Sequence, residues 1–274
     1  MRLRGRVGAT MKTIIAHLTI ALFLAACGQQ SSDPAIEKND AAEPGMSIYA
    51  AAVDSPSRPD ADRERDTFRQ PAAVLEFFGI EPGMTVLDLF SGGGYYAELL
   101  SSIVGESGLV VAHSNQAYLG VVGDEFQTRH AENRLPNVEV MMAENNELEL
   151  DAGHFDAIMM TLSFHDLYYS APDRGWPKID GEKLLAELYK GTRPGGLVGV
   201  IDHHADAGSP SETGNTLHRI DPAIVIAQFE AAGFVLEDES ELLRNMNDDH
   251  SKIVFDPEIR GKSDRFVMRF RKPE

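Results

Sequence analysis

The sequence predicts an α/β fold with a mostly parallel seven-stranded sheet and helices on both of its faces. Short apolar runs rich in strand-forming residues recur along the chain, and helix-length segments with one apolar face separate them. Glycine-containing turns join the two kinds of segment. This alternation favours parallel strands, because each helix returns the chain to the end where the next strand begins. Ligands of such sheets bind beyond the carboxyl ends of the strands.

The predicted elements begin at Pro71, a residue that can occupy the first turn of a helix. Apolar residues then share one helical face up to residue 78, and Glu-Pro-Gly at 81–83 predicts a turn before the first strand. The predicted strands are 85–90, 109–113, 138–142, 155–162, 197–202, 234–237 and 266–271, and the predicted helices are 72–78, 95–104, 116–133, 181–191 and 222–232.

Composition limits the partners of the chain. Its 274 residues, 43% of them hydrophobic, are enough for one sizeable domain with a single core. The formal net charge is −18, and a surface this acidic repels phosphate backbones and anionic membrane surfaces. We therefore expect no nucleic acid partner.

Residues 1–26 have the parts of an export signal: a basic run, an apolar run and small residues before Cys27. The apolar run is too short to span a bilayer as a mature helix. Leu-Ala-Ala-Cys at 24–27 resembles the bacterial lipobox, which implies cleavage before Cys27 and acylation of that residue. We therefore predict a lipoprotein anchored to a membrane on the periplasmic side of the cell envelope, and Gly28 favours the outer membrane. A simple secretory signal cut near Ala26 is the alternative.

Residues 27–54 are mostly small and polar, without a sustained period, and predict a flexible tether. The folded domain is then predicted over residues 55–274. Interleaved arginines and aspartates over 58–69 predict a solvated or salt-bridged helix face at its start. Cys27 is the only cysteine, so no intramolecular disulfide can form.

A glycine-rich segment, VLDLFSGGGYY at 86–96, joins the first predicted strand to a helix. Glycines allow a tight turn and let a ligand approach bare backbone at a helix N-terminus. The segment lacks the Gly-Lys-Ser/Thr ending of a phosphate-clamping loop, which argues against nucleoside triphosphates. Its G-x-G-x-x-A pattern keeps a nicotinamide oxidoreductase open, although no acid ends the second strand. Asp88 could accept hydrogen bonds from a ligand ammonium group.

The stretch VLDLFSGGGYYAELL resembles the first motif of class I S-adenosylmethionine-dependent methyltransferases, and later motifs keep the family's order over roughly residues 55–272. RPGGLVGVIDH at 193–203 is similar to the family's turn into strand five, and EAAGF at 230–234 to the turn before strand six. This resemblance implies a Rossmann-like class I methyltransferase fold with an antiparallel last strand, and S-adenosylmethionine as cofactor. FHDLYY, DHHADAGS and RGKSDRFVMRFRKP resemble, more narrowly, a bacterial group of exported predicted methyltransferases.

The resemblance also implies a cofactor site at the ends of the first three strands. The residues that it assigns to the cofactor are Asp88, Phe90, Ser91, Gly92, Gly94, Asn115 and Glu144. Two departures from the family pattern stand out. Phe90 replaces the usual first glycine of the loop, and the second strand lacks the carboxylate that usually grips the ribose hydroxyls. We therefore expect weaker cofactor binding or a shifted pose.

Histidines gather at the predicted ends of strands four and five, which meet at the same edge of the sheet. A histidine near its ordinary pKa suits the removal of a proton from a methyl acceptor. The predicted catalytic residues are His165, Asp166, His203 and His218, and the predicted substrate contacts are Tyr168, His204 and Arg219. The residues at 248–250 are expected to be polar surface.

The predicted function is therefore an S-adenosylmethionine-dependent methyltransferase acting on a small molecule or an envelope component. The same imidazoles and carboxylates could instead bind a metal, but no H-x-x-x-H spacing supports this, and we predict no metal site. Some histidines could also cap helices or bond to loop backbone. A methyl donor made in the cytoplasm fits an exported enzyme poorly. The alternatives are therefore a non-catalytic envelope lipoprotein that binds a nucleoside or other small ligand, and an NAD-binding oxidoreductase.

Overall fold

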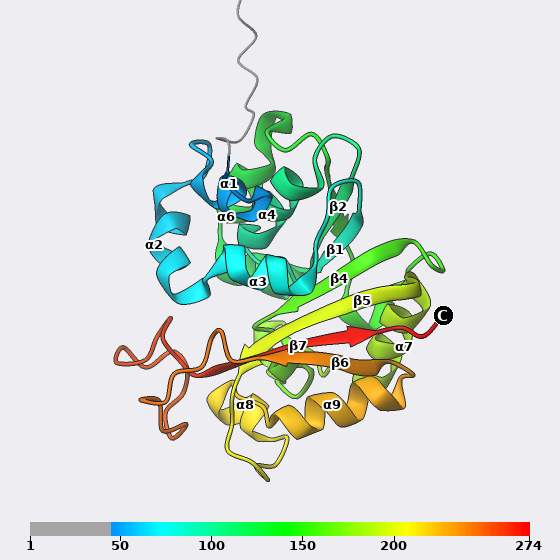
Figure 1. The fold of residues 1–274 in the computed structure, drawn as a ribbon. Helices are drawn as coiled ribbons and strands as arrows, with labels where there is room; N and C mark the ends of the chain where they lie inside the picture. The colour runs from blue at the N-terminus through cyan, green and yellow to red at the C-terminus, as the bar shows by residue number, and fades with distance from the viewer. Residues whose placement is uncertain (1–44) are drawn as a thin grey trace, which may run out of the picture. The chain divides into compact units, whose positions relative to one another are not determined.

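The structure is a computed structural model that describes residues 45–274 (Figure 1). The predicted signal at 1–26, the lipidation site Cys27 and the tether up to residue 44 lie outside the described residues. Within the described part of the chain, no helix combines the length and apolarity needed to cross a membrane.

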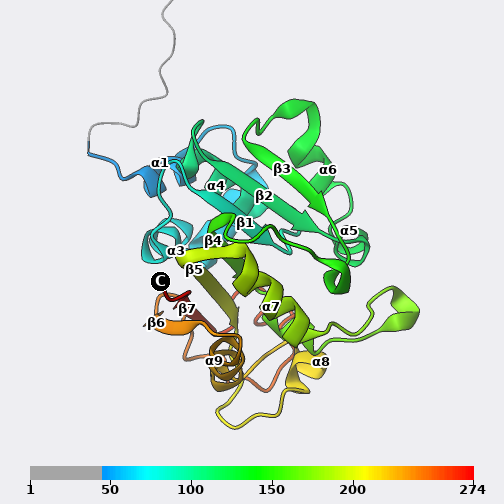
Figure 2. The ribbon, with the colours of Figure 1, turned by 90° about the vertical axis from the view of Figure 1, so that its right-hand side faces the viewer.

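A seven-stranded sheet in the order β3-β2-β1-β4-β5-β7-β6 forms the centre of the fold (Figures 1 and 2). Strands β1 to β5 pair in parallel, and β7 runs antiparallel to both β5 and β6. The strands are β1 (Thr85–Leu89), β2 (Leu109–Ser114), β3 (Val138–Met142), β4 (Phe155–Thr161), β5 (Thr192–His203), β6 (Val235–Ser240) and β7 (Arg265–Arg271). This arrangement confirms the predicted fold class. The chain order reverses between β1 and β4, where sheets of this kind open a ligand crevice.

Helices cover both faces of the sheet because alternate strand residues point to opposite sides. Val86 faces a core shared with α1, α3 and α4, whereas Leu87 faces a core shared with α7 and α9. The helices are α1 (Ile48–Asp54), α2 (Asp60–Arg69), α3 (Pro71–Phe78), α4 (Tyr95–Val104), α5 (Gln116–Val122), α6 (Glu125–His130), α7 (Gly181–Gly191), α8 (Thr213–Leu217) and α9 (Pro222–Ala231). Short 3-10 turns are η1 (Ala131–Asn133), η2 (Asn145–Glu147), η3 (Phe164–Leu167) and η4 (Pro172–Arg174).

Three elements differ from the sequence prediction. The last residues of the predicted tether form α1, whose Ala52 is buried against the core, so the folded part begins before Ser55. The single helix predicted over 116–133 is split into α5, α6 and η1, because Gly123 ends α5 with φ 58°. Strand β5 begins earlier than predicted and carries an irregular register in which Gly195 adopts φ 69°.

Candidate active site

The turn between β1 and α4, residues 91–94, is the glycine loop, and it places Asp88 at the carboxyl edge of the sheet. Asp88 is buried and accepts a 2.6 Å hydrogen bond from the Ser91 hydroxyl. Burial raises the pKa of the Asp88 carboxyl to about 6, although hydrogen bonds from Ser91 and the Ala97 backbone oppose the shift. The fold therefore keeps a carboxylate, whose ionised form is destabilised by burial, at the position where ligands of such sheets bind.

Phe90 lies under the glycine loop in an unusual backbone conformation. Its φ of 55° is in the left-handed region that favours glycine. The ring stacks on Tyr118 with 5.2 Å between centroids and meets the edge of His113. His113 is buried, and its Nε2 lies 3.0 Å from the Ala143 carbonyl oxygen. Burial lowers the pKa of His113 to about 4, so this ring is neutral. The Phe90 ring is thus packed between Tyr118 and His113, and its predicted effect on the cofactor pocket stays a prediction.

Asn115 and Glu144 meet at the carboxyl ends of β2 and β3, where the sequence placed them. The Asn115 side chain donates a 2.6 Å hydrogen bond to the Asn145 side chain and accepts a 2.9 Å bond from the Tyr118 backbone. A Glu144 carboxylate oxygen lies 3.4 Å from the Gln116 backbone nitrogen, which donates to it. Amide and carboxylate groups therefore border one end of the crevice.

Buried hydroxyl groups without partners mark the same edge. Among the residues that the structure describes, Ser114, Thr161 and Ser163 each hold a buried hydroxyl with no hydrogen-bond partner. Leaving such a group unsatisfied costs about 1–3 kcal/mol. Because these three hydroxyls lie at or just beyond the ends of β2 and β4, they indicate a site for a polar ligand.

Side chains of α6 cover part of the glycine loop. A Cβ on Gly93 would clash with the carboxylate group of Glu125, and one on Gly94 would lie 2.6 Å from Cδ of Arg129. A Cβ on Gly92 would have no neighbour closer than 3.8 Å. The space that a side chain on Gly94 would occupy is therefore filled by Arg129, and the role of Gly94 in cofactor binding stays a prediction. Gly92 keeps open space beside it.

An arginine network ties α2, α4 and α6 together over the loop. Its members are Asp62, Arg65, Glu98, Glu125, Arg129 and Arg134. The buried guanidinium of Arg129 bonds both Asp62, at 2.7 Å, and Glu98. Burial would raise the pKa of Asp62, but the bonds and charge of Arg129 outweigh it and hold that pKa below its usual range. The predicted salt-bridged helix face is confirmed.

A second polar group, the histidine cluster, consists of His165, Asp166, Asp202 and His218. Turn η3 follows β4 and carries the first two residues, and β5 carries Asp202 near its end. Nδ1 of His165 lies 2.7 Å from a carboxylate oxygen of Asp202, whose other oxygen accepts from the His165 backbone at 2.7 Å. Nε2 of His165 lies 3.1 Å from Nδ1 of His218 and 3.3 Å from Oδ1 of Asp166. Segments far apart in sequence therefore converge as predicted.

The two central imidazoles of the cluster differ in charge because of the carboxylates near them. Burial would lower the pKa of His165, but Asp202 and Asp166 outweigh it and raise that pKa to about 9. Burial and the nearby charge of His165 lower the pKa of His218 to about 4. Near neutral pH the first ring carries a proton on each nitrogen, and the second is neutral and accepts a hydrogen bond at Nδ1.

Two further residues flank the cluster. Tyr118, which was not predicted to be part of a site, donates its hydroxyl to Oδ2 of Asp166. Only the folding of α5 over the sheet edge brings these residues together. His203 is buried with Nδ1 2.6 Å from the Ser263 hydroxyl oxygen, and its ring centroid lies 5.7 Å from that of His165. His203 therefore lies beside the cluster.

Arg219, which was predicted to contact the acceptor, is enclosed by protein in this structure. Its side chain is fully buried, and one guanidinium nitrogen donates to both oxygens of Asp248 at 2.9 Å. Asp248 is correspondingly buried, although the sequence placed it on the surface. His204 stacks on His250 with 5.1 Å between centroids, away from the histidine cluster. These groups brace the long segment before β7.

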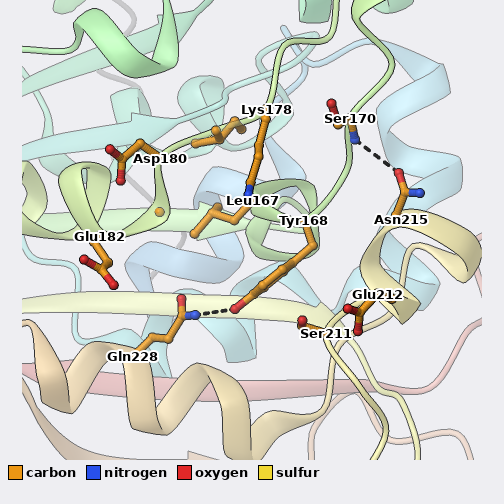
Figure 3. A pocket seen from close by; sticks show the side chains of 12 residues that line it. Leu167, Tyr168, Ser170, Lys178, Asp180, Glu182, Ser211, Glu212, Asn215 and Gln228 are labelled. Atoms are coloured by element: carbon orange, nitrogen blue, oxygen red, sulfur yellow. Dashed lines mark hydrogen bonds between the residues drawn. The ribbon is translucent and has the colours of Figure 1, made fainter.

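Tyr168 lines a pocket of about 730 Å³ bordered by α7, α8 and α9 (Figure 3). Its hydroxyl accepts a hydrogen bond from the Gln228 side chain, and Asn215 accepts one of 3.1 Å from the Ser170 backbone. The charged lining residues are Lys178, Asp180, Glu182 and Glu212. Acidic groups outnumber the single lysine, which favours an uncharged or cationic ligand.

Comparisons with known proteins point to one class of enzyme. The family model of protein-L-isoaspartate(D-aspartate) O-methyltransferase matches residues 49–167. The ubiquinone/menaquinone biosynthesis C-methyltransferase UbiE of Vibrio cholerae is 27% identical over 130 residues, which cover 47% of this chain and 45% of that protein. The UbiE of Psychromonas ingrahamii is 29% identical over 140 residues, covering 47% and 46%. The chain thus matches about half the length of these curated relatives.

A solved structure extends the likeness beyond this segment. A SAM-dependent methyltransferase from Aquifex aeolicus is 27% identical, with a TM-score of 0.54 over 78% of this chain and 98% of that one. Together with the sheet order, these matches show that the chain is similar in sequence and fold to class I S-adenosylmethionine-dependent methyltransferases, and this similarity implies S-adenosylmethionine as cofactor. The comparisons favour neither the nicotinamide oxidoreductase nor the non-catalytic alternative.

The residues present fit this cofactor in their chemistry. Asp88 offers a carboxylate to an ammonium group, and Asn115 and the unpartnered Ser114 hydroxyl offer bonds to ribose. Gly92 leaves open backbone in the loop between these positions. Side chains of α6 lie close to Gly93 and Gly94, so Gly92 is the glycine of this loop with the most open space beside it.

Proposed function

We propose that the protein methylates a small molecule or a component of the cell envelope, and that the histidine cluster assists by removing the acceptor's proton. One observation carries this proposal: Nε2 of His165 is presented by a ring that Asp202 holds in place, at the sheet edge that also carries Asp88. When bound, S-adenosylmethionine supplies a methyl group on a positively charged sulfur. The protein's own task is alignment and proton removal.

Asp88 would hold the ammonium group of the cofactor, with Ser91 fixing the carboxylate by its 2.6 Å hydrogen bond. Asn115 would bond the ribose hydroxyls, and Glu144 would accept from the adenine amine. Neutral Asn115 binds hydroxyls more weakly than the carboxylate usual in this class, so we expect modest cofactor affinity.

The acceptor would enter beside Tyr168, which follows the histidine cluster directly in sequence. Asp202 binds Nδ1 of His165, so the acceptor's proton would pass to Nε2 in the molecules whose Nε2 is unprotonated, a fraction that increases as the pH rises toward 9. The carboxylate of Asp166, 3.3 Å from that nitrogen, stabilises the resulting charge. The acidic lining of the pocket supports an uncharged or cationic acceptor rather than an acid.

Labelled methyl transfer tests this function. The protein is incubated with methyl-labelled S-adenosylmethionine and fractions of a cell-envelope extract, and the labelled product is identified. His165→Gln should lower the rate by about 100-fold or more, in the range that general bases contribute. His154→Gln, at an exposed position, is the matched control. Equal rates for the two variants would contradict the role of the cluster.

We also propose that Cys27 carries the lipid anchor and that the enzyme works at a membrane facing the periplasm. The Leu-Ala-Ala-Cys sequence supports this proposal. Cys27→Ala should move the protein from the membrane fraction to the aqueous fraction, because the acyl chains supply most of the membrane affinity. Unchanged partitioning, or an unmodified N-terminal peptide in mass spectrometry, would contradict it.

A further inference from the structure

Three atoms of the histidine cluster are spaced as the ligands of one metal ion. Nε2 of His165, Oδ1 of Asp166 and Nδ1 of His218 are separated by 3.1, 3.3 and 3.8 Å. A point equidistant from the three lies about 2.0 Å from each, which is the length of zinc–nitrogen and zinc–oxygen bonds in proteins. We propose that the protein binds a divalent metal ion, zinc, at this point. This inference replaces the prediction that the chain has no metal site.

The groups behind the three ligands hold them in the orientation that a metal requires. Asp202 engages Nδ1 of His165 at 2.7 Å and so leaves Nε2 as the nitrogen that faces the other ligands. Tyr118 donates to Oδ2 of Asp166 and leaves Oδ1 free. Carboxylates behind ligating histidines, and hydrogen bonds to ligating carboxylates, recur in protein metal sites.

The charge of the cluster also favours a cation. Asp166 and Asp202 are both buried, and in the described part of the chain neither forms an ion pair with lysine or arginine. Buried carboxylates are otherwise paired with a cation or coordinate a metal. In the described part of the chain the His165 ring is the one cation beside these two carboxylates, so one negative charge stays unbalanced; zinc would displace the Nε2 proton of His165 and supply two positive charges.

The backbone of His218 is held in a conformation that serves this geometry. Its φ is 52°, in the left-handed region, directly after α8. Such conformations cost free energy in residues other than glycine and cluster at functional sites. Here the conformation accompanies the close approach of Nδ1 to His165. The His218 side chain is also 14% exposed, which leaves one side of the metal position near solvent.

Three protein ligands and one accessible position are the composition of a catalytic zinc site. If the proposed methyl transfer is correct, an acceptor oxygen or sulfur at the fourth position would lose its proton more easily, because the cation stabilises the anion. His165 would then serve as a ligand and not as the base. This role rests on the proposed function, whereas metal binding itself does not.

A second group of similar composition differs in how the charge of its carboxylate is balanced. His204, His250 and Asp264 also have ligand atoms close together. However, Asp264 already accepts hydrogen bonds of 2.9 and 3.1 Å from Arg244, and the other nitrogen of His250 bonds Asp206 at 2.8 Å. The arginine supplies the charge that a metal would bring, so this group provides a matched negative control.

The test measures metal directly. The full chain, purified without a histidine tag, is dialysed against zinc and analysed for bound metal, and Co²⁺ is titrated as a coloured probe of the coordination. We expect one zinc per chain. His218→Ala and Asp166→Asn should abolish binding, Tyr118→Phe should weaken it about 10-fold, and His250→Ala should leave it unchanged. Asp166→Asn preserves side-chain shape, and circular dichroism verifies that each variant is folded.

The possible outcomes separate the two proposals. Absence of zinc from the folded wild-type chain would overturn the metal site, as would zinc that His218→Ala and Asp166→Asn retain. Loss of zinc in His250→Ala alone would place the metal in the second group and overturn this assignment. Zinc bound as expected without any methyl transfer would instead contradict the proposed function and leave the metal site standing.

Discussion

The arginine network around the glycine loop and the histidine cluster both bury two carboxylates, but they neutralise them differently. In the arginine network, Asp62 and Glu98 share the permanently charged guanidinium of Arg129. In the histidine cluster, the groups next to Asp166 and Asp202 that can carry a positive charge are imidazoles, which can lose protons and bind metals. The first arrangement can only hold structure, whereas the second can take part in chemistry.

Removing the central charge of the arginine network should have the largest effect. Arg129→Met leaves Asp62 and Glu98 buried without a cation, and we expect it to lower the free energy of unfolding by about 3–5 kcal/mol. Chemical denaturation measures the change. Arg193→Met is the control, because it breaks an exposed pair with Asp156 that should contribute about 0–1 kcal/mol. Equal losses in the two variants would remove the structural role assigned to the network.

Asp88 is a buried carboxylate, and burial destabilises its ionised form. Asp88 should therefore lower the stability of the fold at neutral pH. Its pKa rises from 3.8 to about 6 on folding, so its unfavourable contribution grows as pH rises through 6. Asp88→Asn should therefore stabilise the protein by about 3 kcal/mol at pH 8 and by almost nothing at pH 4. Denaturation curves at the two pH values measure this, and a difference independent of pH would contradict the assignment.

Two neighbouring glycines separate backbone strain from side-chain crowding in the glycine loop. Gly94 has φ 79° and faces the buried Arg129, so Gly94→Ala should cost at least about 1–2 kcal/mol of stability. Gly93 does not have a positive φ and faces the end of Glu125, an exposed side chain that can move. Gly93→Ala should therefore cost less in thermal denaturation, and the reverse order would show that α6 does not pack on Gly94 as described.

The smallest expected effect lies in the pocket. Tyr168→Phe removes the hydroxyl that accepts from Gln228, and one such hydrogen bond is worth about 0.5–1.5 kcal/mol. We expect kcat/KM for the acceptor to fall about 2- to 10-fold through a higher KM, with cofactor affinity unchanged. An altered affinity for S-adenosylmethionine would mean that the pocket belongs to the cofactor and not to the acceptor.

The sequence predicted the sheet well because its central strands β1, β2, β4 and β5 are apolar runs that are buried on both faces. It did not predict α1, since a short helix such as 48–54 gains its stability from tertiary packing. The break at Gly123 was missed because a glycine inside a helical pattern does not by itself fix a left-handed residue.

The convergence of the histidine cluster followed from the shared edge of parallel strands, so sequence reasoning found it. The hydrogen-bond partners of each polar side chain depend on contacts between distant segments, and no local sequence pattern predicts these contacts. Tyr118 reaches Asp166 from α5, and Arg219 meets Asp248 in the interior. Charged residues are expected outside the core unless paired, and the pairing of Arg219 could not be read from spacing.

A calorimetric titration with S-adenosylmethionine at pH 8 tests the central claim most directly. We expect the wild-type protein to bind S-adenosylmethionine with micromolar affinity, a binding free energy of about −8 kcal/mol, and Asp88→Asn to lose this binding. That variant is expected to be more stable than the wild type at this pH, so the loss could not be attributed to unfolding. Absence of heat from folded wild-type protein, or equal affinity in Asp88→Asn, would contradict the assignment of the glycine loop to the cofactor.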